Sequence, residues 1–99
     1  MKTLSKDNVI YSFNPNNEPI YFVDDGETFW VETDDCYSGQ IKTSSDLRPN
    51  IDISIMDAAV GPINISNATT SDVLCVEILD IQFENQGVMV TSKGLGVLG

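Results

Sequence analysis

The chain has 99 residues, which suits one domain with a modest core, because a chain of this length buries only about 60 to 65% of its unfolded surface. Fifteen acidic side chains against five basic ones and no histidine give a net charge of −10, which repels the phosphates of nucleic acids and anionic lipids, so we expect neither as a partner. The first residues lack the apolar run of a signal peptide and nothing later approaches a membrane span, so the expected location is cytoplasmic, with Cys36 and Cys75 as free thiols.

Short strand-like runs separated by turn residues make up the N-terminal half. Residues 9–13 predict a first strand, which ends at the Asn-Pro-Asn-Asn sequence of residues 14–17. Residues 20–23 predict a second strand. The Asp-Gly turn within residues 24–27 favours a hairpin between that strand and a third one over residues 28–33.

The third predicted strand ends in a group of reactive side chains. Asp34, Asp35 and Cys36 follow it directly, and Gly39 and Gln40 then turn the chain away. A carboxylate pair beside a thiol at the exit of a rigid strand suits a general base, a metal ligand or the support of a nucleophile. The same residues also fit a solvated turn whose carboxylates accept backbone N–H groups, and both interpretations stay open at this point.

The C-terminal half shows the same alternation and no helical period. After the polar excursion of residues 41–50, short strands are expected over residues 51–55 and 63–65. Residues 73–84 form the best core strand, and residues 88–91 form a strand that returns along it. We therefore predict an all-β fold of about seven short strands in a sandwich or jelly-roll-like arrangement.

Two side chains of the expected core strand bear on function. Glu77 stands between apolar neighbours, so it is either a catalytic carboxylate or a structural one with a partner, and we favour the structural role. Cys75 is expected to be a small core residue.

The glycine-rich tail is no nucleotide site, because such a loop must lie between a strand and a helix.

Several motifs in register resemble the acetamidase/formamidase family of amide hydrolases. The letters ETDDC at residues 32–36, followed by GQ at residues 39–40, carry the resemblance most specifically. Gly-Pro-Ile at residues 61–63, the run at residues 72–81 and the closing glycine-rich residues 94–99 extend it across nearly the whole chain.

The resemblance implies a function and a set of site residues. It implies hydrolysis of the C–N bond of a short linear amide, formamide or acetamide, to ammonia and a carboxylate. Asp35 would be the base or a metal ligand and Glu32 its supporting carboxylate, while Gln40 and Gly61 would bind substrate. The cofactor stays open, with a divalent metal ion (zinc or calcium) as the one that the family allows. Cys36 is the rival nucleophile, although the chain has no histidine to activate it.

The resemblance also implies that residues 1–99 are a single β domain similar to the N-terminal third of an amidase. The loop before Gly61 departs from the family's N-P-x-T-G-P pattern at Asp57, Ala58 and Val60, which leaves substrate preference open. Family members continue into histidine and acidic motifs, so we expect a homo-oligomer or a missing C-terminal part as partner. The alternative function is a non-catalytic β module, or a split or truncated subunit that docks on a partner.

Overall fold

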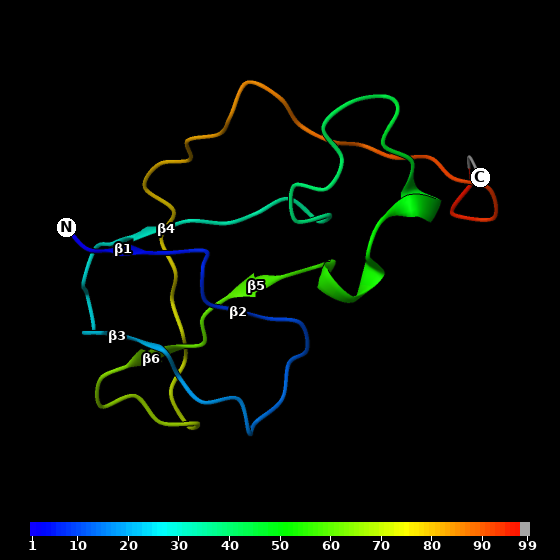
Figure 1. The fold of residues 1–99 in the computed structure, drawn as a ribbon. Coiled ribbons are helices and arrows are strands. Elements are labelled where there is room, and N and C mark those ends of the chain that lie inside the picture. The colour runs from blue at the N-terminus through cyan, green and yellow to red at the C-terminus, as the bar shows by residue number, and fades with distance from the viewer. Residues whose placement is uncertain (98–99) are drawn as a thin grey trace.

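The structure, a computed structural model, describes residues 1–97. Leu98 and Gly99, which close the glycine-rich tail, lie outside the described residues. The strands are β1 (Thr3–Leu4), β2 (Val9–Ile10), β3 (Tyr21–Val23), β4 (Trp30–Val31), β5 (Ala59–Val60) and β6 (Ile63–Ile65), and the 3-10 helices are η1 (Arg48–Asn50) and η2 (Ile53–Ile55) (Figure 1). No α-helix occurs within residues 1–97, and the all-β prediction is confirmed.

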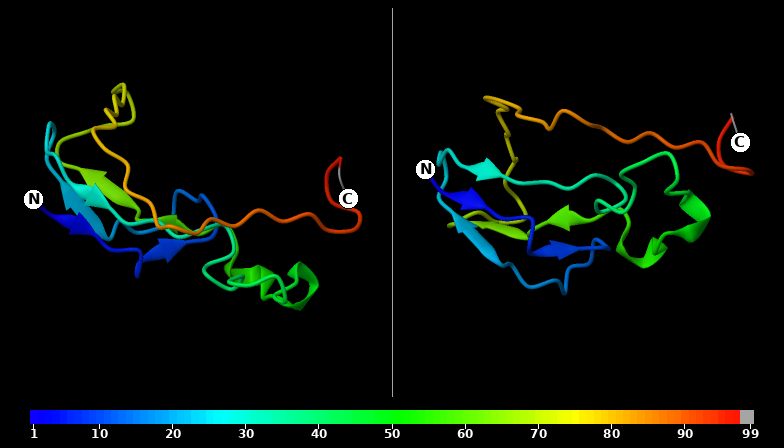
Figure 2. Two further views of the ribbon diagram at one scale, coloured as in Figure 1. Left: turned by 90° about the horizontal axis from the view of Figure 1, so that it is seen from above. Right: turned by 45° about the horizontal axis from the view of Figure 1, so that its top comes forward.

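The strands pair as three separate two-stranded ladders. β1 runs parallel to β4, β2 antiparallel to β5, and β3 parallel to β6. The strands gather at one end of the molecule, whereas η1, η2 and the C-terminal residues lie at the other (Figure 2). The radius of gyration of the Cα atoms is 16.5 Å, larger than the roughly 13 Å of a compact domain of this length.

Side-chain hydrogen bonds tie the ladders to one another at the strand end of the molecule. The Lys2 ammonium donates to the carbonyl oxygen of Phe22 at 2.8 Å and lies 3.3 Å from a carboxylate oxygen of Glu27. The Tyr21 hydroxyl donates to the Ser5 carbonyl oxygen at 2.7 Å. These contacts connect β3 and the turn after it to the N-terminal residues around β1.

The core within the described residues is small. Leu4 of β1 and Val23 of β3 are its buried hydrophobic side chains, with 2% and 4% of their surfaces exposed. Full burial of one such side chain contributes about 1.5 to 3 kcal/mol, which is little against the entropy lost by a chain of this length. The three ladders therefore form an open arrangement and not a closed sandwich.

The predicted hairpin is only half correct. The turn forms, with the Glu27 N–H donating to the Asp24 carbonyl oxygen at 3.1 Å and Gly26 at a φ of 78°, where a side chain would be strained. The strands on either side do not pair with each other, because β3 pairs with β6 and β4 pairs with β1. Distant partners thus override the local turn signal.

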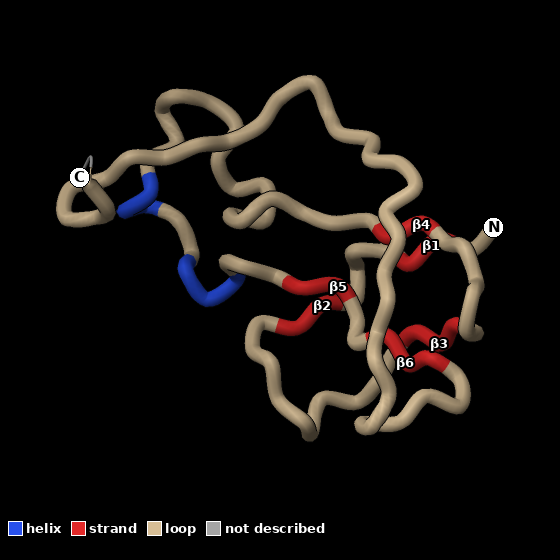
Figure 3. Tube along the Cα trace, turned by 180° about the vertical axis from the view of Figure 1, so that it is seen from behind, coloured by secondary structure: helices blue, strands red, loops and turns tan. Residues whose placement is uncertain are grey.

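Three predicted strands are absent from the described residues. Residues 51–55 contain η2 instead, where the Asp52 carboxylate accepts the Ser54 N–H at 2.9 Å and caps the short helix. Residues 73–84 and 88–91 have no strand pairing and run as a continuous loop (Figure 3). Residues 1–97 contain six strands where about seven were expected for the chain.

The expected core strand is exposed along its whole length. Its large apolar side chains expose between 64% and 94% of their surfaces; they are Val73, Leu74, Val76, Ile78, Leu79, Ile81 and Phe83. Cys75 and Glu77 are also exposed, so neither lies in a core. The prediction was wrong here because an apolar strand is buried only where a second layer covers it, and residues 1–97 supply none.

None of the described segments is a helix long and apolar enough to cross a membrane.

Candidate functional site

Asp35 lies at the start of a tight turn that holds both oxygens of its carboxylate. One oxygen accepts the Tyr37 N–H at 2.7 Å and the other accepts the Gly39 N–H at 3.2 Å. The Asp35 carbonyl oxygen accepts the Ser38 N–H at 3.0 Å. Ser38 and Gly39 have φ values of 53° and 74°, so the chain turns back in the left-handed region, which glycine adopts without strain. The carboxylate is fixed in orientation and exposed to solvent.

Cys36 contacts the loop that precedes β5. Its thiol donates to a carboxylate oxygen of Asp57 at 3.0 Å, and its carbonyl oxygen accepts the Asp57 N–H at 2.8 Å. The hydrogen bond to the Asp57 carboxylate raises the pKa of the Cys36 thiol, with smaller contributions from desolvation and from the charges of Asp57 and Asp35. Because the thiolate is the reactive form, this environment disfavours Cys36 as a nucleophile.

Gln40 and Ser38 contact the same loop further along. The Gln40 carboxamide donates through Nε2 to the Asp52 carbonyl oxygen at 2.9 Å and accepts the Asp52 N–H through Oε1 at 2.8 Å. The Ser38 hydroxyl donates to the Ile55 carbonyl oxygen. Nε2 retains one further N–H, which a ligand could accept.

Asp52 of this loop and Asp46 of residues 41–50 are stabilised in their ionised form. The hydroxyl and the N–H of Ser54 lower the pKa of Asp52 below its ordinary value. The N–H groups of Lys42 and Thr43 lower the pKa of Asp46 in the same way. Hydrogen bonds to the charged form are the leading cause in both cases, so these loops depend on ionised carboxylates.

Glu32 and Gly61 lie in the ladders and not in the Asp35 turn. Glu32 follows β4, and its carboxylate accepts the Lys6 N–H at 3.2 Å. Gly61 is buried between β5 and β6, where its N–H donates to the Asn8 carbonyl oxygen at 3.1 Å. The structure therefore brings Asp35 and Gln40 into one turn, while Glu32 is hydrogen-bonded to the residues after β1.

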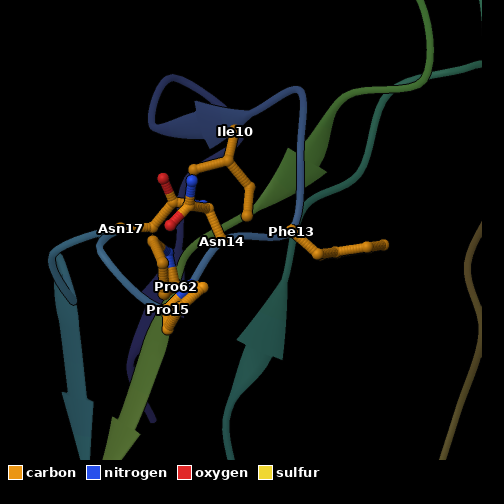
Figure 4. A pocket seen from close by; sticks show the side chains of 6 residues that line it. All are labelled: Ile10, Phe13, Asn14, Pro15, Asn17 and Pro62. Atoms are coloured by element: carbon orange, nitrogen blue, oxygen red, sulfur yellow. The ribbon is translucent and has the colours of Figure 1, made fainter.

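A shallow hollow of about 500 Å³ lies next to Gly61 (Figure 4). It is lined by Ile10, Phe13, Asn14, Pro15, Asn17 and Pro62, with the Phe13 side chain extending away from the other five. A second hollow of about 450 Å³ lies between residues 41–48 and 86–91. Neither lining includes Asp35, whose carboxylate stands on an open surface.

The described residues do not fit a complete metal centre. Among residues 1–97, no group of three His, Cys, Asp or Glu side chains could hold a metal ion. Zinc and calcium need four to eight ligands, and protein side chains supply at least three of them in most sites. We therefore assign no step of the chemistry to a metal held by these residues alone.

Ser38 and Asp57 carry contacts that were not anticipated from the sequence. Asp57 was noted only for its departure from a family pattern, yet it holds Cys36 through both its backbone and its side chain. The usable signal was the Ser-Gly pair after Asp35, since an aspartate followed by such residues favours a turn closed by its own carboxylate. The partners of these residues, 17 to 21 positions away, had no local signal.

The described residues thus form a small all-β unit with the Asp35 carboxylate held by backbone N–H groups at its surface. The sequence model of the Acetamidase/Formamidase family matches residues 2–98. The chain belongs to the acetamidase/formamidase family, and the resemblance seen in the sequence is confirmed.

Two relatives show how much of the family this chain covers. It is 38% identical over 85 residues to a "Putative formamidase" of Schizosaccharomyces pombe, across 77% of this chain and 20% of that protein. The crystal structure of an acetamidase from Bacillus halodurans matches with a TM-score of 0.64 and 33% identity, across 67% of this chain and 22% of that one. The chain thus spans about a fifth of the length of these relatives.

Proposed function

We propose that this chain is the N-terminal part of an amide hydrolase that releases ammonia and a carboxylate from a short linear amide such as formamide or acetamide. Family membership over residues 2–98 supports the class of reaction. The single observation that supports the site is the Asp35 carboxylate, fixed by the N–H groups of Tyr37 and Gly39 and open to solvent.

Asp35 is the proposed general base. Each of its oxygens accepts one backbone N–H and keeps a second lone pair, with which it can bind a water molecule. As the water oxygen bonds to the amide carbon, its proton passes to Asp35. The proton then moves to the departing nitrogen while the C–N bond breaks, so that atoms and charge balance.

The other site residues have supporting roles in this proposal. Gln40 uses its remaining Nε2 proton to bind the carbonyl oxygen of the amide, and Gly61, which precedes Pro62 of the hollow, is the second proposed substrate contact. Glu32, which follows β4 and accepts the Lys6 N–H, is the supporting carboxylate in this proposal. In a metal-dependent version, Asp35 would be one ligand, and the others would come from outside residues 1–97.

We further propose that residues 1–99 form one β domain whose sandwich or jelly-roll of about seven strands closes only against more protein. The exposed apolar side chains between Val73 and Phe83 and the large radius of gyration support this. The additional layer would come from a C-terminal part like that of the longer relatives or from further copies in a homo-oligomer. The absence of a disulfide among the described cysteines fits the cytoplasm as location.

A chimera tests the proposed function. In the chimera, this chain replaces the stretch of the Bacillus halodurans acetamidase that it matches, and ammonia release from formamide and acetamide is measured. Asp35→Asn should lower kcat by about 10² to 10⁴, because a general base contributes on this scale. Asp25→Asn, in the exposed turn before β4, is the matched control and should leave kcat unchanged.

Two outcomes would contradict the proposal. One is a chimera that folds, by circular dichroism, but releases no ammonia. The other is an Asp35→Asn chimera with full turnover, which would remove Asp35 from the chemistry.

The second candidate is a non-catalytic β module that docks on a partner. The exposed apolar run over residues 73–84 favours it, since an apolar segment that pairs with no strand can add to the sheet edge of a partner. A chimera in which Asp35→Asn has no effect, together with tight binding of the isolated chain to a partner, would favour this function over hydrolysis.

A further inference from the structure

We propose that Cys36, Ser38 and Gln40 are positioning residues that hold the Asp35 turn against the loop of residues 52–57. The inference rests on the proposed function, in which Asp35 is the reacting carboxylate. It concerns how the chain fixes that carboxylate, which is a separate question from whether the amide is hydrolysed.

Alternate residues of the turn have different partners. The N–H groups of Tyr37 and Gly39 donate to the Asp35 carboxylate, at 2.7 Å and 3.2 Å. The residues between and beside them, Cys36, Ser38 and Gln40, all bind the second loop instead. One set orients the carboxylate within the turn, and the other anchors the turn.

The three anchoring contacts follow one another like the rungs of an antiparallel ladder. They join Cys36 to Asp57, Ser38 to Ile55, and Gln40 to Asp52. Gln40 makes both hydrogen bonds of a β-bridge, since it donates to the Asp52 carbonyl oxygen and accepts the Asp52 N–H. Side chains thus supply the pairing that a backbone ladder supplies elsewhere.

The backbone geometry supports a positioning role. Ser38 and Asp57, at two of the three rungs, have φ values of 53° and 58°, a region that non-glycine residues rarely adopt. Strained conformations of this kind persist where the surroundings hold them and are frequent at functional sites. The hydrogen bonds of the Ser38 hydroxyl and of the Asp57 carboxylate are the contacts that hold them here.

Amide hydrogen exchange, measured by nuclear magnetic resonance on this chain, tests the inference. In Gln40→Leu, which keeps the side-chain size, we expect the Asp52 amide to exchange about five- to tenfold faster, as for the loss of one hydrogen bond. The Tyr37 and Gly39 amides should also exchange faster and shift in resonance. Gln82→Leu, the same change in the exposed 73–84 segment, should leave all three amides unchanged.

Two further variants separate positioning from a general loss of structure. Ser38→Gly removes the hydrogen bond to the Ile55 carbonyl oxygen, while glycine adopts the left-handed backbone of this position without strain. The Tyr37 and Gly39 amides should again exchange faster. Cys36→Ala should also make the Tyr37 and Gly39 amides exchange faster. Cys36→Ser retains a donor to Asp57, so these amides should exchange as slowly as in the unchanged chain. The Trp30 amide, bonded to Lys2 in the β1–β4 region, should remain unchanged in every variant.

The inference is overturned if the Tyr37 and Gly39 amides exchange equally fast in the unchanged chain and in Gln40→Leu. It is also overturned if the Trp30 amide changes together with them, because the effect would then be global. Neither readout depends on amide turnover, so an inactive chimera with intact rungs would reject the proposed function and leave this inference standing.

Discussion

At the scale of single residues, the thiol and the carboxylates around Asp35 have distinct electrostatic environments. The Cys36 thiol donates a hydrogen bond to the Asp57 carboxylate, and this bond raises the pKa of the thiol. The Asp52 carboxylate accepts hydrogen bonds that lower the pKa of that carboxyl. The raised pKa keeps the Cys36 thiol protonated near neutral pH, which disfavours it as a nucleophile.

The reactivity of Cys36 should depend on Asp57. Asp57→Asn removes the negative charge, and asparagine tolerates the φ of 58° at this position. The Cys36 thiol should then ionise more easily and react several-fold faster with iodoacetamide at pH 8, as followed by peptide mass spectrometry. The exposed Cys75 is the internal control, and its rate should stay constant. An unchanged rate at Cys36 would contradict the hydrogen bond between the two side chains.

The loop that contains Asp52 should loosen only in acid. The folded-state pKa of Asp52 lies below its ordinary value of 3.8, so its contribution to stability is present above about pH 3.8 and is lost as the pH falls through the folded value. The Ser54 amide resonance should be constant from pH 7 to 5 and move below pH 3.8. Asp52→Asn cannot ionise and should show no such transition. Movement of the wild-type resonance above pH 5 would contradict the assignment.

At the scale of elements, local signals located the Asp-Gly turn and four of the seven expected strands, whereas the other three are absent from residues 1–97. The Asp-Gly turn and the strands at Val9–Ile10, Tyr21–Val23 and Ile63–Ile65 all lie where the sequence pattern placed them. Which strand pairs with which was not predictable, because β1 with β4 and β3 with β6 are parallel pairs of segments distant in sequence. Such pairing depends on tertiary packing, which no local propensity records.

The residues of the candidate site were also only partly predictable from the sequence. The sequence pointed to Asp35 and Gln40, which share one turn, because reactive side chains cluster there within a few residues. Glu32, only three positions before Asp35, is hydrogen-bonded to Lys6, since it extends the β4 pairing with β1. Closeness in sequence was a poor guide to closeness in space at the end of a strand, where the chain changes direction.

Gly61 should be intolerant of a side chain. Its φ is 121°, and an added Cβ would stand 3.0 Å from the Ile63 backbone nitrogen. Gly61→Ala should therefore destabilise the β5–β6 region by about 1 to 3 kcal/mol. Gly87→Ala, at a position with no atom within 4 Å of the added Cβ, is the matched control. Equal denaturant midpoints for the two variants would contradict the expected conflict between an added Cβ at Gly61 and the Ile63 backbone.

At the scale of the whole molecule, the chain has far more exposed apolar surface than a closed domain. The run from Val73 to Phe83 is open throughout, and the two buried hydrophobic side chains among the described residues lie elsewhere, in β1 and β3. The sequence identified this run as the most apolar strand candidate, but it forms no strand within residues 1–97. Its alternation could not reveal that no second layer covers it among the described residues.

Association of the purified chain should strengthen with salt. The net charge of −10 opposes contact between copies, but the Debye length falls to about 8 Å at physiological ionic strength and about 3 Å at 1 M. Light scattering should show the apparent mass rising between low and high salt. A compact monomer at both concentrations would mean that the chain closes its own core and would favour an independent binding module.

The most direct test of the account is complementation in trans. The chain is mixed with a Bacillus halodurans acetamidase that lacks the matching 22% of its length, and ammonia release from acetamide is followed. The account predicts no release by either part alone, because base, substrate contacts and oxyanion donors must converge in one site. It predicts turnover in the mixture and a rate about 10² to 10⁴ lower when the added chain carries Asp35→Asn. Release by the 99-residue chain alone at the rate of the mixture, or equal release with Asp35→Asn, would contradict it.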